Sequence, residues 1–125
     1  MSASVLFTIV ETIVLPDCTA VYQKFGITEY RPESQRKAIS LLKKTRPDYV
    51  LAEFQYGYGN NYAGVNISNL DVFLASMQKY APTAKVIVLV SKPERNHVDK
   101  LAQLFPIETV LTVPVQARQI EACFV

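Results

Sequence analysis

The sequence predicts an α/β domain with a five-stranded parallel sheet in the flavodoxin-like order 2-1-3-4-5 and helices on both faces. Short apolar runs alternate five times with amphipathic segments of helix length, which is the pattern of repeated β-α units. Few other topologies fit, because crossovers between parallel strands are right-handed. A length of 125 residues suits one domain, so we expect a single domain over residues 1–125.

Five short runs are the predicted strands. Three of them, SVLFTIV, YVLAEF and KVIVLV, are nearly continuous in apolar residues, as in strands buried on both faces of a parallel sheet. The second predicted strand is weaker, and Pro32 cuts it off. The predicted strands cover residues 4–10, 27–30, 49–54, 85–90 and 109–113.

Two predicted helices combine a start signal with an apolar stripe. Ser34 can cap the first of them, which ends before Pro47. Ser68 is the expected cap of the second. The two stripes are Ala38, Ile39, Leu41 and Leu42, and Leu70, Phe73, Leu74 and Met77.

The remaining three predicted helices are recognised mainly by residues that typically start or stop a helix. Pro16 and Asp17 offer a start and Gly26 a stop for the earliest helix, and Pro93 opens the fourth. The last helix is predicted within residues 116–125. The residues expected to face inward from these helices are Val21, Tyr22, Phe25, Val98, Leu101, Leu104, Ile120, Cys123 and Phe124.

Composition and charge exclude several classes of function. Half of the residues are hydrophobic and 19% are charged, which suits a packed core and argues against disorder. The net charge of +2 and the lack of a long basic run argue against nucleic-acid binding by this domain alone. Two distant cysteines and one histidine predict neither a disulfide framework nor a zinc site. We expect a soluble cytoplasmic protein that neither crosses nor binds a membrane.

In a sheet of this order, ligands bind where the strands end. The residues at the predicted carboxyl ends are Glu11, Glu53, Ser91 and Val113. We therefore expect any functional site to include these positions. No Gly-rich phosphate loop follows the first strand, so a nucleotide site is not predicted.

The stretch from residue 34 to residue 54 carries a helix, a turn of sequence Arg46-Pro47-Asp48 and an apolar strand. This order resembles the receiver domains of bacterial two-component response regulators. The segment NLDVFL, residues 69–74, is similar to the start of the third receiver helix. The resemblance extends over most of the chain.

The resemblance implies a degenerate receiver site, of the pseudo-receiver type. Glu53 stands where receivers carry the phosphoacceptor Asp, and Val113 stands in place of a Lys. Glu11 takes one of two paired acid positions, Thr12 takes the other, and Ser91 takes the Thr/Ser position. Phosphoryl transfer depends on precise placement and on neutralising charge. We therefore expect no catalytic residue, no cofactor and no metal site, with weak Mg²⁺ binding at Glu11 and Glu53 left open.

For two residues at this site, two interpretations each stay open. Glu53 could mimic a permanently charged state or be an ordinary acid at a strand end. Lys92 could pair with Glu53 or Glu11, or be solvated. His97 is expected to be a surface residue rather than a catalytic base.

Residues 55–68 form a long predicted loop, longer than the usual receiver connection. It holds Tyr56, Tyr58 and Tyr62, which could contact a partner or form a lid over the strand ends. A surface insertion packed on itself is the alternative.

The sequence thus predicts a non-phosphorylatable pseudo-receiver that acts as a protein-interaction or dimerisation module in signalling. The fourth helix, fifth strand and fifth helix are the expected contact surface, with Phe124 left for a second copy to cover. The alternative is a flavodoxin-like small-ligand-binding protein or enzyme, with the loop of residues 55–68 as its lid.

Overall fold

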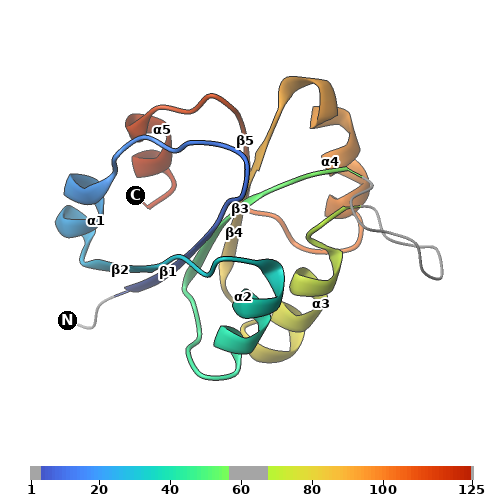
Figure 1. The fold of residues 1–125 in the computed structure, drawn as a ribbon, viewed down its shortest axis with the longest axis horizontal. Helices are drawn as coiled ribbons and strands as arrows, with labels where there is room; N and C mark the ends of the chain where they lie inside the picture. Colours follow the sequence, from blue (N-terminus) through green and yellow to red (C-terminus); the bar gives the residue numbers. More distant parts are fainter. Residues whose placement is uncertain (1–3, 57–67, 125) are drawn as a thin grey trace.

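A computed structural model describes residues 4–56 and 68–124, and it contains a five-stranded parallel sheet in the order β2-β1-β3-β4-β5 (Figure 1). This confirms the predicted fold class. The strands are β1 (Ser4–Ile9), β2 (Ile27–Tyr30), β3 (Tyr49–Glu53), β4 (Lys85–Val90) and β5 (Thr109–Thr112). The helices are α1 (Thr19–Phe25), α2 (Gln35–Leu42), α3 (Asp71–Tyr80), the 3-10 turn η1 (Lys92–Glu94), α4 (Arg95–Ala102) and α5 (Ala117–Ala122).

The helices cover both faces of the sheet. Helices α1 and α5 lie on one side, and α2, α3 and α4 lie on the other (Figure 1). The strands are in parallel register, with Phe7 opposite Val50 and Val88 opposite Val110. This register brings the carboxyl ends of β1, β3, β4 and β5 to one edge of the sheet.

Each face of the sheet has its own core, because successive strand residues point to opposite sides. On the α2, α3 and α4 side, Phe7, Val50 and Val88 pack against buried residues of those helices. On the α1 and α5 side, Leu6, Leu51 and Leu89 pack with the helices there. The continuous apolar runs of the sequence are therefore explained by burial on both faces.

Two of the predicted helix boundaries are seen in atomic detail. The Ser34 hydroxyl accepts a hydrogen bond of 3.2 Å from the backbone N–H of Lys37, so Ser34 caps α2. Gly26 ends α1 with φ of 66°, a left-handed conformation that glycine adopts without steric cost.

The structure corrects the prediction that Ser68 caps α3. Leu70 holds the capping position, and α3 begins at Asp71. Ser68 instead donates from its hydroxyl and its backbone N–H to the Asp71 carboxylate, at 2.9 and 2.8 Å. The expected stripe of Leu70, Phe73, Leu74 and Met77 is fully buried.

Two expectations about buried and exposed side chains were wrong. Leu104 lies beyond the end of α4 and is 58% exposed, because the helix stops at Ala102. Phe124 is only 9% exposed, so it is not left for a second copy to cover. Its ring packs edge-on against Tyr49, with ring centroids 4.8 Å apart, and against Tyr22, at 6.0 Å.

No helix within residues 4–56 and 68–124 has the length and apolar character needed to cross a membrane.

Candidate functional site

The candidate site lies at the edge of the sheet where the carboxyl ends of the strands meet. A pocket of about 230 Å³ there brings together four of the predicted positions, Thr12, Glu53, Ser91 and Val113. The Glu11 side chain is exposed and does not line this pocket, although its backbone faces Glu53. The remaining lining residues are Ile13, Phe54, Gln55, Leu89, Val90 and Glu94.

Glu53 is the last residue of β3 and is 5% exposed. Its Oε1 accepts hydrogen bonds from the backbone N–H groups of Glu11, at 2.7 Å, and Thr12, at 2.9 Å. Its Oε2 accepts from the Thr12 hydroxyl and from the Gln55 amide, the latter at 3.1 Å. Both carboxylate oxygens therefore have two donors each, which satisfies a buried charge.

The charge state of Glu53 follows from these contacts. Burial pushes the pKa of its carboxyl upward, because it disfavours the charged form. The hydrogen bonds from Thr12, Glu11 and Gln55 favour the charged form and together hold the pKa below its ordinary value of 4.5. Glu53 is therefore ionised at neutral pH, and four hydrogen-bond donors of the chain stabilise its charge.

Gln55 and Asn69 belong to this network, and they were not singled out from the sequence. The Asn69 side chain donates to the backbone carbonyl of Glu53, at 2.8 Å, and accepts from the backbone N–H of Gln55, at 2.7 Å. The only feature of the sequence that could have indicated these two residues is that they are polar and stand at the two ends of the long loop. These bonds join the two ends of the loop to the end of β3.

The positions after β4 and β5 are less polar. Ser91 precedes η1, but its side chain makes no capping hydrogen bond. The half-buried Val113 donates from its backbone N–H to Val90, at 2.9 Å, and brings no charge to the pocket. Lys92 forms no ion pair with Glu53 or Glu11, so of the two readings left open for it, the paired one has no support.

The residues present do not form a strong cation site. Within the described ranges, no three His, Cys, Asp or Glu side chains come close enough to hold a metal ion. Mg²⁺ needs oxygen ligands in a nearly ideal octahedron. Glu53 already uses both oxygens for intramolecular donors, and the Glu11 side chain lies outside the pocket.

Of the three loop tyrosines, Tyr58 and Tyr62 lie outside the described residues. Tyr56 is 43% exposed and stacks on His97, with ring centroids 3.6 Å apart and planes at 14°. The Lys100 ammonium lies 5.6 Å from the Tyr56 ring, and the Tyr56 backbone N–H donates to Glu94. Tyr56 is therefore held against η1 and α4 and does not line the pocket at Glu53.

Comparison with known proteins identifies the fold. No family model matches the sequence, and no curated protein matches it. A response-regulator receiver domain protein from Clostridium thermocellum matches with a TM-score of 0.70 at 14% identity, over 98% of this chain and 91% of that one. A response regulator from Thermotoga maritima matches with a TM-score of 0.69 at 12% identity, over 96% of this chain and 93% of that one.

The same fold also occurs in the pilus assembly protein CpaE from Caulobacter crescentus. That structure matches with a TM-score of 0.60 at 15% identity, over 96% of this chain and 89% of that one. At these identities the comparisons speak for the fold and not for a shared activity. The chain has the fold of the response-regulator receiver domains.

Proposed function

We propose that this chain is a non-phosphorylatable receiver-like domain that works in cytoplasmic signalling by binding a protein, and that it is not an enzyme. One observation carries the proposal. Both oxygens of the Glu53 carboxylate, at the position of the phosphoacceptor, are hydrogen-bonded within the chain.

Phosphoryl transfer to a carboxylate needs an oxygen that is free to attack and cations that neutralise the phosphoryl charge. Attack by Glu53 would require breaking its bonds to Thr12 and to Glu11 or Gln55. Val113 supplies no cation at the end of β5. Each of these features raises the free-energy barrier to phosphoryl transfer, and together they argue against phosphorylation of Glu53.

The same bonds give Glu53 a structural role. They tie the segment after β1 to the end of β3, so this edge of the sheet is held in one arrangement. A receiver site that switches needs two arrangements of similar free energy. The network around Glu53 supports a domain whose binding surface is permanently presented.

For the binding surface, we propose the face formed by α4, β5 and α5. β5 is an edge strand, and an edge strand has backbone groups free to pair with another chain. Leu104, two residues after α4, is 58% exposed. Isolated exposed apolar residues are common, so the edge strand is the stronger of the two arguments.

A small-ligand-binding protein or enzyme is the second candidate, because a pocket does lie beside Glu53. Its volume of about 230 Å³ leaves room only for a ligand smaller than a drug-sized compound. Its one buried carboxylate is already satisfied by donors of the chain. The satisfied carboxylate favours the binding module over the ligand-binding alternative.

The first test is a titration with Mg²⁺ and beryllofluoride, a phosphoryl analogue, followed by amide shifts in NMR. We expect no saturable shift at Thr12, Glu53 or Ser91, and no phosphoryl adduct by mass spectrometry after incubation with acetyl phosphate. A saturable shift that requires Mg²⁺ and is centred on these residues would overturn the proposal.

The proposed face is tested by oligomeric state, measured by sedimentation equilibrium. If the partner is a second copy, Leu104→Asp weakens the dimer, whereas Val72→Asp does not. Val72 is a matched control, because it is 60% exposed and belongs to α3, which is not one of the three proposed elements. Equal weakening by both variants would show that the dimer does not use this face.

A further inference from the structure

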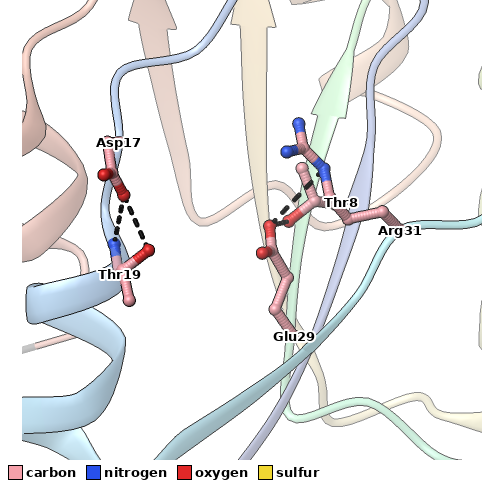
Figure 2. A network of polar contacts seen from close by, with 5 residues as sticks. All are labelled: Thr8, Asp17, Thr19, Glu29 and Arg31. Atoms are coloured by element: carbon pink, nitrogen blue, oxygen red, sulfur yellow. Dashed lines mark hydrogen bonds and ion pairs between the residues drawn. The ribbon is translucent and has the colours of Figure 1, made fainter.

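A second pocket, of about 280 Å³, lies between the segment before α1 and the end of β2. It shares no lining residue with the pocket at Glu53. Asp17 and Thr19 line it on one side, and Glu29 and Arg31 line it on the other, as Figure 2 shows. The buried Tyr22 also lines it. The receiver resemblance assigns no function to any of these residues.

Glu29 is fixed in this pocket by a buried partner. Thr8, on β1, is 1% exposed, and its hydroxyl donates to Glu29 Oε2 at 2.7 Å. The Glu29 side chain is itself 24% exposed. Within residues 4–56 and 68–124, the other carboxylate oxygen, Oε1, accepts no hydrogen bond. The carboxylate is thus oriented by Thr8, and its second oxygen is available to a donor from another molecule.

Arg31 is close to Glu29 but does not form a good pair with it. The Arg31 Nε lies 3.8 Å from Glu29 Oε2, which is too long for a hydrogen bond. A well-formed Arg–carboxylate pair has two parallel hydrogen bonds. In the described part of the chain, the two terminal nitrogens of Arg31 make no hydrogen bond or ion pair. Its fork of donors is therefore available to a carboxylate from another molecule.

The opposite side of the pocket adds a second carboxylate. Asp17 Oδ1 accepts from the backbone N–H and the hydroxyl of Thr19, at 3.0 and 2.7 Å, which orients the carboxyl group (Figure 2). Burial raises the pKa of the Tyr22 hydroxyl far above its usual range, and it also raises the pKa of the Cys18 thiol. Those two groups are therefore neutral, and the pocket holds two negative charges and one positive charge.

We propose that this pocket binds the α-ammonium and α-carboxylate groups of a small free amino acid. The ammonium group meets Glu29, with Asp17 across the pocket, and the carboxylate meets the guanidinium of Arg31. This pairing uses all three charges of the pocket and gives Glu29 Oε1 a donor. The volume of about 280 Å³ suits a compound smaller than a drug-sized ligand.

This inference does not depend on whether Glu53 can be phosphorylated. An amino acid bound here would link the start of α1 to the end of β2, far in sequence from the β5 edge. The domain would then be a binding module that also takes a metabolite.

The test is a titration of the full chain with each of the common L-amino acids, followed by amide shifts in NMR. We expect at least one to give saturable shifts centred on Thr19, Glu29 and Arg31. Ethylamine and propionate, which each lack one of the two charged groups of alanine, serve as matched probes. Each should bind about 10- to 100-fold more weakly than the amino acid, because one charge-assisted contact is lost.

Two variants identify the contacts. Arg31→Gln removes the guanidinium, and Glu29→Gln removes the charge while keeping an oxygen that can accept from Thr8. Each should weaken binding about 10-fold or more, whereas Arg36→Gln, an exposed control on α2, should leave it unchanged. Three results would each overturn the proposal. These are no saturable shift with any amino acid, equally tight binding of ethylamine, and unchanged binding by both pocket variants.

Discussion

Thr12 binds Glu53 twice, through its backbone N–H at 2.9 Å and through its hydroxyl. The resemblance to receivers puts an acid at the Thr12 position, where it would help to hold a cation beside the phosphoacceptor. A threonine there adds a hydroxyl donor to Glu53, beside the backbone N–H that any residue would supply. The added donor helps to keep the buried carboxylate ionised.

The Thr12→Val variant tests the contribution of the hydroxyl. Valine keeps the shape and the backbone N–H but removes one donor to the Glu53 carboxylate. We expect the free energy of unfolding to fall by about 1.5–3 kcal/mol, the range for a hydrogen bond to a charged group. Urea denaturation measures the loss. The exposed Thr112 is the control, and Thr112→Val should change stability by less than about 0.5 kcal/mol. Equal effects of the two substitutions would show that the hydroxyl adds nothing.

Glu53 also predicts a pH dependence of stability. Its folded-state pKa is below the ordinary value of 4.5, so the unfolded chain takes up a proton first as the pH falls. The stabilisation from the ionised carboxylate is therefore complete above about pH 4.5 and is lost as the pH falls through the folded pKa. Urea unfolding at a series of pH values measures this slope.

The Glu53→Gln variant isolates the contribution of Glu53 to the change of unfolding free energy with pH. Asp17 and Glu33 also have lowered pKa values, because Thr19 and Lys37 donate to them, and they contribute in both proteins. We expect the variant to lose less stability than the natural chain below about pH 4.5. Parallel curves for the two proteins would contradict the lowered pKa of Glu53.

The fold was predictable because its signals are local and repeated. Apolar runs mark the strands, and Ser34 and Gly26 act as boundary residues through their own chemistry. The partners of Glu53 were not predictable, because two of its four donors are backbone N–H groups, which any residue carries. Sequence position placed Glu53 at the end of a strand, but only the folded chain shows what it contacts.

The two errors in burial also have physical causes. Helical spacing extended the stripe of α4 to Leu104, but the helix ends two residues earlier, at Ala102. Helical spacing correctly placed Phe124 on the inward side of α5, but the shortness of α5 led to the wrong expectation that a second copy covers it. Its burial depends on rings from distant parts of the chain, Tyr22 and Tyr49, and the periodicity of α5 carries no information about them.

Phe124 should accordingly be a major contributor to stability. Its ring contacts Tyr22, Phe25 and Tyr49 and helps to close the core between α1 and α5. We expect Phe124→Ala to lower the free energy of unfolding by about 3–5 kcal/mol, as in other buried Phe→Ala changes. Leu104→Ala, at an exposed site, should cost less than about 0.5 kcal/mol. A small loss for Phe124→Ala in thermal or urea unfolding would show that the cluster is not tightly packed.

The stacked pair of Tyr56 and His97 should couple the start of the long loop to α4. Aromatic pairs contribute about 0.5–1.5 kcal/mol beyond the area that they bury. A double-mutant cycle of Tyr56→Ala and His97→Ala should therefore give an interaction energy in that range. Tyr56→Ala with Arg118→Ala, an exposed residue of α5, is the control pair and should be additive. Additivity in the first cycle would mean that the rings touch without stabilising each other.

Gln35, at the start of α2, is a position where we expect a substitution to increase stability. Its amide nitrogen and oxygen are both buried, and neither forms a hydrogen bond with a residue of 4–56 or 68–124. An unsatisfied buried amide costs about 1–3 kcal/mol, whereas an apolar group of similar shape carries no such cost. Gln35→Met keeps the length of the side chain and removes both polar atoms, so it should stabilise the protein by about 1 kcal/mol. Gln78→Met, at an exposed position of α3, is the control and should have little effect. If Gln35→Met lowers the midpoint of urea unfolding, the amide has a favourable interaction that its buried position conceals.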